Sequence, residues 1–324
     1  MMSAGAAAAP YLTIIATGRN DDFGGDFNRR FFRALDFNHL QLAAAGITYE
    51  FVFVEWRPID KRPLLASLLA DEFVDSSLAL RSYVVDPAYH QALSLNPRLQ
   101  FQEFIAKNVG IRRARGEFVL TTNTDIYFSR GVIARLQEST LQPGVLYRAA
   151  RHDLKSALDV SDIDWDVLED ERNCEIVNVI RPPLFTNASG DFLLLDRSTS
   201  QRLRGFNEVY RVAKIHIDGN FCMKAHVSDI PLVDIGAPVY HVGRGTLHAM
   251  RGMYNARPVD APWGDIRWKS DVVYDNGEGW GLGFAPEREI DRGTTFLAFD
   301  WDAVGPMVEL RRVVSPGLRQ EKAL

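Results

Sequence analysis

The chain has 324 residues, of which 46% are hydrophobic and 24% are charged, an ordinary composition for a globular protein with a large core. Its net charge of −5 at pH 7 argues against nucleic acid or an anionic membrane surface as a partner. No stretch approaches the ~20 consecutive apolar residues that a membrane-spanning helix requires, so we expect no transmembrane segment.

The start of the chain and the cysteines bear on where the protein works. Residues 1–10 lack the basic beginning of a signal peptide and predict a disordered tail that leads into a strand. The two cysteines, Cys174 and Cys222, match no metal or redox spacing, and we interpret them as reduced thiols. We therefore expect a cytoplasmic protein, with peripheral association with the inner membrane and the oligomeric state left open.

Short apolar runs alternate with amphipathic stretches through the first half of the chain. The runs predict buried strands at residues 11–16, 49–55, 81–86 and 116–121. Their near-continuous apolar character is typical of a parallel sheet covered on both faces. Helical spacing fills the segment that ends at Gly46 and the segment from Pro97 to Gly116. This alternation predicts a Rossmann-like α/β fold.

The second half of the chain has strand candidates separated by longer loops. These candidates lie at residues 144–148, 191–196 and 231–235. From about residue 244 onward the sequence is rich in Gly, Trp, Tyr and Pro and is too aromatic for a plain linker. We expect this segment to form a lid or a binding loop over the domain.

The strand at 116–121 ends in a polar tip, Thr-Asn-Thr-Asp at residues 122–125. Asn123 and Asp125 are two residues apart, so in extended chain they point to the same side. In open α/β sheets ligands bind outside the carboxyl ends of the strands, and carboxylate and amide oxygens suit Mg²⁺ and Mn²⁺. The alternative is an ordinary turn, because Asn, Thr and Asp are common in loops.

Asn108 lies on the apolar stripe of the preceding helix, among Phe104, Ile105 and Ile111. A buried amide needs hydrogen-bond partners. It either bonds a neighbouring loop or faces a ligand held at the strand ends, and the sequence leaves both interpretations open.

The stretch "AKNVGIRRARGEFVLTTNTDIYF", residues 106–128, resembles GT-A glycosyltransferases of the family-2 type. In that family an Arg/Lys-Asn dipeptide, a glycine, an A-x-G-E-Y/F turn and an apolar strand precede a metal-binding Asp-X-Asp motif. The matching residues here are Lys107-Asn108, Gly110, Ala114 to Phe118, and Asn123-Thr124-Asp125. The chain departs from the family at Asn123, which stands where the first Asp is expected and removes one carboxylate.

Further matches to the family occur in the expected order. "ATGRNDD" follows the first strand, where the family's first loop contacts the nucleotide, and Glu55 ends the second strand, where an acidic residue meets the nucleoside. "RGFNE" at 204–208 resembles the family's "GGFDE"-like turn. "HIDGNFCMKAH" at 216–226 resembles its acidic motif at the start of a helix, with Ile217-Asp218 in place of a Glu-Asp pair.

The resemblance covers roughly residues 11–245 and implies a GT-A fold, a mostly parallel Rossmann-like sheet flanked by helices with a C-terminal loop-rich extension. It implies a nucleotide-sugar-binding half at 11–130, an acceptor-binding half of the same domain at 131–245, and a lid or extension at 246–324. The implied enzyme is a metal-dependent hexosyl- or N-acetylhexosaminyl-transferase. It moves a sugar from a nucleotide sugar, expected to be a UDP-sugar, to a saccharide or other hydroxyl acceptor, with Mn²⁺ or Mg²⁺.

Within this resemblance, the metal ligands are expected to be Asp125, Asn123 and His241, the last following the apolar run "APVY". Asp218 is the expected general base, with Asp191 as the second candidate or a group that orients the acceptor. Each has a structural alternative: His241 as a core or turn histidine, Asp218 as a helix cap, and Asp191 as a loop acid.

The residues expected to bind the nucleotide-sugar cofactor come from several loops. They are Thr17, Arg19, Asn20, Glu55, Asn108, Asn123, Thr124, Arg244 and Trp280. Trp280 lies between glycines in "NGEGWGLG", where a mobile aromatic face stacks on a sugar or, alternatively, packs in the core.

Two other functions stay open at this stage. A nucleotidyltransferase also binds a metal-held phosphate on an α/β sheet, but "TGRNDDFGG" is acidic where a triphosphate needs positive charge. A non-catalytic, glycosyltransferase-like module that binds sugar or nucleotide is favoured by Asn123, because one expected metal ligand is missing.

Overall fold

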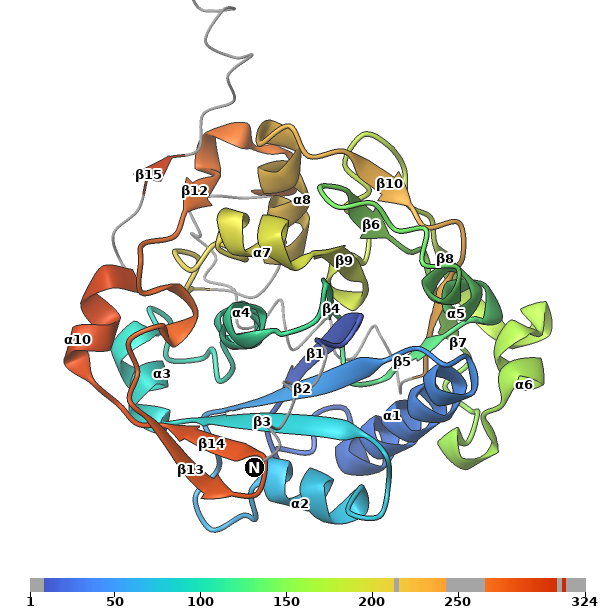
Figure 1. The fold of residues 1–324 in the computed structure, drawn as a ribbon, viewed down its shortest axis with the longest axis horizontal. Coiled ribbons are helices and arrows are strands. Elements are labelled where there is room, and N and C mark those ends of the chain that lie inside the picture. Colours follow the sequence, from blue (N-terminus) through green and yellow to red (C-terminus); the bar gives the residue numbers. More distant parts are fainter. Residues whose placement is uncertain (1–8, 213–215, 243–265, 308–310, 313–324) are drawn as a thin grey trace, which may run out of the picture.

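The computed structural model of the chain describes residues 9–212, 216–242, 266–307 and 311–312. Its centre is a nine-stranded, mostly parallel sheet, which confirms the expected fold class (Figure 1). From one edge to the other the strands are β10 (Leu232–Asp234), β6 (Leu146–Arg148), β9 (Leu193–Asp196), β4 (Phe118–Thr121), β1 (Leu12–Gly18), β2 (Tyr49–Trp56), β3 (Ala79–Val85), β14 (Thr294–Leu297) and β13 (Glu287–Asp291). Strand β9 is antiparallel to β4 and β6, and β13 is antiparallel to β14.

Helices cover both faces of the central sheet (Figure 1). One face packs against α1 (Phe27–Ala44), α2 (Leu65–Glu72) and α5 (Arg130–Gln137). The other face packs against α3 (Pro87–Leu93), α4 (Glu103–Arg113), α7 (Arg197–Leu203), α8 (Ile217–Val227) and α10 (Trp301–Val304). Because successive side chains of a strand point to opposite faces, Ile14 joins the first core and Ile15 the second, which explains the unbroken apolar runs.

The helix expected to start at Pro97 begins instead at Glu103. The side-chain oxygen of Asn96 accepts a hydrogen bond from the backbone N–H of Arg98, which holds the Pro97 stretch in a turn. No helix in the described part of the chain has the length and apolar character that crossing a membrane requires.

A smaller, four-stranded sheet lies beside the carboxyl end of β4. Its order is β5 (Ile126–Phe128), β11 (Val239–His241), β7 (Arg151–Leu154) and β8 (Cys174–Asn178), with α6 (Trp165–Glu169) packed nearby. In its register His241 stands opposite Ile126 on one side and opposite Asp153 on the other. The polar tip that ends at Asp125 is therefore brought to the end of β11.

Part of the C-terminal segment expected to form a lid belongs to the central sheet. Strand β14 pairs in parallel with β3 and carries β13 as its outer neighbour. The strands β12 (Tyr274–Asp275) and β15 (Arg311–Arg312) form a separate pair. The described C-terminal residues thus extend and cover the domain core.

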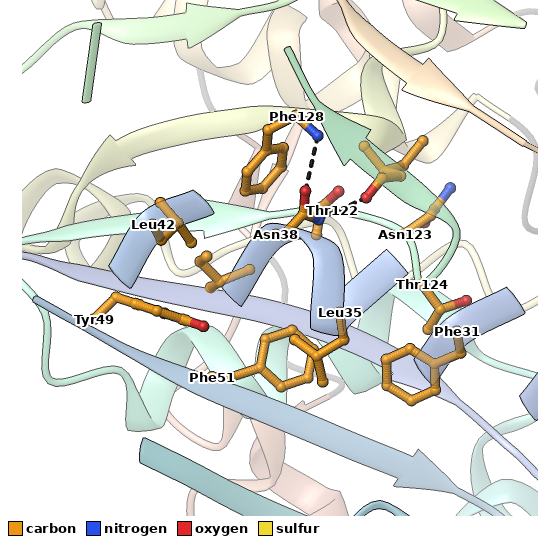
Figure 2. Close-up of a pocket in the computed structure, with 12 residues that line it drawn as sticks. Phe31, Leu35, Asn38, Leu42, Tyr49, Phe51, Thr122, Asn123, Thr124 and Phe128 are labelled. Atoms are coloured by element: carbon orange, nitrogen blue, oxygen red, sulfur yellow. Dashed lines mark hydrogen bonds between the residues drawn. The ribbon is translucent and has the colours of Figure 1, made fainter. Parts of the chain in front are cut away.

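Helix α1 fixes the position of β5 through the side chain of Asn38 (Figure 2). Its amide donates to the carbonyl of Ile126 at 2.8 Å and accepts from the N–H of Phe128 at 2.9 Å. A strand of three residues has few hydrogen bonds of its own, so this amide takes the place of a neighbouring strand. Apolar side chains such as Leu35 and Phe128 enclose a cavity of about 20 Å³ beside it.

We expect Asn38→Ala to lower the free energy of unfolding by about 1–3 kcal/mol, because it leaves buried backbone groups of β5 without partners. Urea unfolding measures this change. The control is Gln41→Ala, a half-exposed position on the same helix, which we expect to change stability by less than about 0.5 kcal/mol. Equal losses in the two variants would show that Asn38 has no special role in holding β5.

Candidate active site

The polar tip after β4 meets the end of β11 at the junction of the two sheets. Oδ2 of Asp125 lies 3.4 Å from Nε2 of His241, and each side chain keeps 17% of its surface exposed. Two residues far apart in the sequence, both expected to bind one metal ion, are therefore neighbours with access to solvent.

A second carboxylate orients the imidazole of His241. Oδ1 of Asp153 lies 2.8 Å from Nδ1 of His241, and Asp153 also accepts from the amide of Asn178 at 2.6 Å. Burial opposes protonation of His241, but the charge of Asp125 and the hydrogen bonds to both carboxylates outweigh it and raise the pKa of the imidazole to about 10. The site favours an imidazolium between two carboxylates.

Arg30, which the sequence analysis did not single out, also pairs with Asp125. Its Nη1 donates to Oδ2 of Asp125 at 2.5 Å, and only 7% of Arg30 is exposed. Burial opposes the ionisation of Asp125, but His241 and Arg30 hold the pKa of its carboxyl well below the usual value. Asp125 is thus an ionised carboxylate with cationic groups on two sides.

Both polar atoms of the Asn123 amide are already hydrogen-bonded to other side chains. Its Oδ1 accepts from Nζ of Lys107 at 2.9 Å, and its Nδ2 donates to Oδ1 of Asp191 at 2.6 Å. Lys107 is fully buried and also pairs with Glu103 at 3.0 Å. Within the described ranges, no group of three or more His, Cys, Asp or Glu side chains is arranged to hold a metal ion.

The two candidate bases lie on the same connected set of contacts. Oδ2 of Asp191 pairs with Arg151 at 2.7 Å. Oδ2 of Asp218 accepts from the hydroxyl of Ser189 at 2.8 Å and from the N–H of Gly190 at 2.7 Å. Oδ2 of Asp218 therefore binds Ser189 and Gly190 and not the N–H groups of α8, to which a helix cap would bind.

These contacts form one chain of alternating charges and polar groups across the junction. It runs through Arg30, Asp125, His241, Asp153, Arg151, Asp191, Asn123 and Lys107. Lys107 continues it to the carbonyl of Gly190, whose N–H binds Asp218. All five side chains expected to bind metal or act as base thus share one network.

A separate group of expected residues lies at the ends of β1 and β2. Gly18 pairs with Glu55 in the parallel register, and Thr17 is buried beside them. Oε2 of Glu55 accepts from the N–H of Ala66 at 2.9 Å, whereas its Oε1 is buried without a hydrogen-bond partner. Burial raises the pKa of the Glu55 carboxyl. A buried acceptor of this kind is a place for a ligand's N–H group.

The loops that follow β1 and β4 hold three more of the expected donor-binding residues. Asn20 donates to the carbonyl of Pro63 at 2.9 Å, and Arg19 donates to the carbonyl of Gln100 at 3.2 Å. Thr124 is buried between Asn123 and Asp125. Arg19 and Asn20 follow β1 directly, so the structure places them on the loop at its carboxyl end.

Asn108 and Trp280 lie inside the protein and contact residues that are not part of this network. Asn108 is fully buried and bonds Phe206 and Glu208, which is the structural alternative considered for it. Trp280 is 4% exposed, with the guanidinium of Arg112 5.2 Å from its ring centre, so it packs in the core. Arg244 lies outside the described residues.

Sequence reasoning missed Arg30, Asp153 and Arg151, although two signals were present. Arg30 interrupts the buried stripe of α1 between Phe27 and Phe31, as Asn108 interrupts that of α4. Arg151 and Asp153 alternate along a short strand and so share one face. A charged residue at a position where the pattern expects an apolar one predicts a buried partner of opposite charge, but the sequence does not show which residue that partner is.

The similarities of the chain to known proteins are distant and come from solved structures. No protein-family model matches the chain, and no curated protein matches it. Among solved structures it resembles S. aureus TarS 1–349, with a TM-score of 0.38 and 15% identity, over 71% of this chain and 60% of that chain. It also resembles the mannosyltransferase PcManGT from Pyrobaculum calidifontis in complex with GDP-Man and Mn²⁺, with a TM-score of 0.45 and 17% identity, over 86% and 73% of the two chains.

A third similar structure is the catalytic domain of Drosophila beta1,4galactosyltransferase 7 in complex with xylobiose. Its TM-score is 0.39 with 10% identity, over 90% of this chain and 95% of that chain. The three are GT-A-type glycosyltransferases, the class that the sequence resembles. Likenesses this distant do not identify a sugar, a donor or an acceptor.

The buried Glu208 beside Asn108 makes stability depend on pH. Burial raises its pKa to about 7, despite hydrogen bonds from Asn108 and the N–H of Gly281. The folded chain therefore binds this proton more tightly than the unfolded chain does. The resulting stabilisation is present below the ordinary pKa of 4.5 and is lost as the pH rises through about 7.

We expect Glu208→Gln to gain up to about 3 kcal/mol of stability relative to the wild type between about pH 4 and pH 8. Urea unfolding across this range measures the difference, and the control is Glu278→Gln at an exposed side chain. A difference between the Glu208→Gln variant and the wild type that does not change with pH would contradict the assignment.

Proposed function

We propose that the chain is a glycosyltransferase that moves a sugar from a UDP-sugar to a hydroxyl group of an acceptor, assisted by a divalent metal ion. The observation that carries the proposal is the meeting of Asp125 and His241 beyond the carboxyl end of β4. Ligands of open α/β sheets bind at this edge. The motifs of the sequence support this class of reaction, and the geometry supports a metal ion bound at this edge beside the leaving diphosphate.

The side chains of Asp125 and His241 fit an ion that takes its other ligands from the substrate. Their 3.4 Å separation is close to the roughly 3 Å between adjacent ligands on metal bonds of about 2.1 Å. Carboxylate and imidazole together suit Mn²⁺, and a carboxylate on the far nitrogen is the usual outer partner of a ligating histidine, as Asp153 is here. A bound ion would take the place of the proton on Nε2 of His241, which would leave to solvent, and would supply positive charge to the diphosphate as it leaves.

The nucleoside is proposed to bind at the ends of β1 and β2. The unpartnered Oε1 of Glu55 supports an N–H donor on the base, such as the single N3–H of uracil. Thr17, near the end of β1, and Arg19 and Asn20, on the loop that follows it, are proposed to contact the nucleoside, and Thr124 on the tip is proposed to lie toward the diphosphate. Residues 11–130 would then hold the donor, and residues 131–245 the acceptor.

Asp218 is the proposed general base of a single displacement with inversion. The acceptor hydroxyl oxygen bonds to the anomeric carbon, the bond from that carbon to the diphosphate breaks, and the hydroxyl proton passes to Asp218. Ser189 and Gly190 fix the orientation of this carboxylate. Asp191, held by Arg151 and Asn123, is proposed to orient the acceptor.

The observation that favours a non-catalytic sugar- or nucleotide-binding module is the ion pair of Arg30 with Asp125. The guanidinium of Arg30 on Asp125, the expected metal ligand, could neutralise a bound diphosphate without a metal ion. A donor-hydrolysis assay with added Mn²⁺ separates the two functions, because the enzyme releases free sugar whereas the module only binds nucleotide. Release of pyrophosphate from a nucleoside triphosphate would indicate a nucleotidyltransferase.

We expect Asp125→Asn to lower sugar transfer by about a hundredfold or more, because it removes the charge on which diphosphate stabilisation depends. Transfer is measured with a panel of nucleotide sugars and Mn²⁺, after a thermal-shift screen has identified the donor. The control Asp159→Asn breaks the neighbouring Arg29–Asp159 pair at the surface and should leave turnover unchanged. Wild-type turnover in the Asp125→Asn variant would refute the proposed metal site.

For Asp218→Asn we expect turnover to fall by about 10²–10⁴ while the dissociation constant of the donor stays within about twofold. The asparagine oxygen can still accept from Ser189 and Gly190, so the loop should keep its shape. Asp229→Asn, at an exposed residue just after α8, is the matched control. Weaker donor binding with unchanged turnover would be incompatible with a base at this position.

A further inference from the structure

Arg30 is held by contacts that join the loop after β1 to Asp125. Its Nη2 donates to the carbonyl of Phe23 at 2.6 Å and its Nε to the carbonyl of Gly25 at 3.1 Å, while Nη1 binds Asp125 at 2.5 Å. Each nitrogen of the guanidinium group thus has a partner. The side chain connects a glycine turn to the carboxylate of the proposed metal site.

The guanidinium binds the oxygen of Asp125 that faces His241, because Nη1 of Arg30 and Nε2 of His241 both lie next to Oδ2. A divalent ion held by Asp125 and His241 would bring two positive charges close to the guanidinium, whereas the imidazolium brings one. Repulsion between the ion and the guanidinium in a largely buried place would therefore favour movement of Arg30 away from Oδ2.

The surroundings of Arg30 provide space and an alternative partner for this movement. Arg30 lines a cavity of about 180 Å³ together with Arg29, Asp26 and Val242. Gly24, at φ +78°, lies against the guanidinium, since a Cβ atom built on it would come within 2.8 Å of Nη2 of Arg30. The carboxylate of Asp26 on the cavity wall can receive the displaced guanidinium.

We propose that Arg30 occupies the cation position beside Asp125 until a divalent ion is bound, so that metal loading exchanges one cation for another. The exchange also frees the carbonyls of Phe23 and Gly25, which couples the loop at residues 22–26 to the metal. Arg30 is a positioning residue in this scheme, and the inference rests on the metal site of the proposed function.

The test is direct binding of Mn²⁺ to the full chain without any donor, measured from the electron paramagnetic resonance signal of the free ion. We expect Arg30→Gln to bind Mn²⁺ at least about tenfold more tightly than the wild type, a factor that corresponds to about 1.4 kcal/mol. Arg29→Gln removes the same charge one residue away, where the partners are Asp159 and Ser161. Its Mn²⁺ affinity should match that of the wild type.

Hydrogen exchange on the wild-type chain gives a second readout that does not depend on a variant folding. Saturating Mn²⁺ should speed exchange at residues 22–27, because Arg30 releases this loop, while exchange in β1 stays unchanged. A purely structural Arg30 would show no such response to the metal.

The outcomes separate this inference from the proposed function. Two results would overturn the proposed replacement of Arg30 by the metal ion. One is Mn²⁺ binding by Arg30→Gln that is equal to or weaker than that of the wild type, and the other is hydrogen exchange at residues 22–27 that does not change with Mn²⁺. If neither chain binds Mn²⁺ but both still bind UDP and transfer sugar, the inference fails and the glycosyltransferase stands. Loss of both metal and UDP binding in the wild type would remove the proposed function as well.

Discussion

The charges from Arg30 to Asp191 at the junction of the two sheets are paired with opposite charges, and the rest of the site depends on this pairing. An uncompensated charge in such a place costs several kcal/mol, so each group fixes the position of the next. Asp125 lies between Arg30 and His241, and Asp153 lies between His241 and Arg151. The geometry of the proposed metal ligands is therefore a property of the whole row of charges.

The row of charges from Arg30 to Arg151 depends on the register of the short strands in the second sheet. The pairing of β11 with β5 and β7 sets His241 opposite Ile126 and Asp153, so a shift by one residue would turn His241 to the other face. Few hydrogen bonds hold such short strands in register. Asn38 supplies two of them from α1, and the packing of Phe128 and Leu35 around it resists a shift.

Local sequence patterns predicted the inner strands of the central sheet, such as β1, β2 and β4, because they are apolar on both faces, but not β13, whose residues are exposed and mostly polar. They did not reveal the second sheet, since β5 has three residues and β7 is mostly polar. Strand pairing between residues as distant as Ile126 and His241 leaves no local trace. For the same reason the resemblance named Asp125 and His241, whereas their partners Arg30 and Asp153 emerged only from the structure. Asn108 and Trp280 show the converse, because a polar or aromatic residue near a motif can serve packing alone.

The presence of asparagine, not aspartate, at position 123 is explained by its hydrogen bonds and does not require that a metal site has been lost. Its amide donates to Asp191 at 2.6 Å and accepts from Lys107 at 2.9 Å, so it needs one donor and one acceptor. An aspartate there would face the carboxylate of Asp191 with no proton between them, and like charges at that distance disfavour ionisation of one. Asparagine satisfies both neighbours and leaves Asp191 free to pair with Arg151. The departure from the motif of the similar family thus lies on the side of the network that we propose for the acceptor, and the proposed cation position rests on Asp125 and His241.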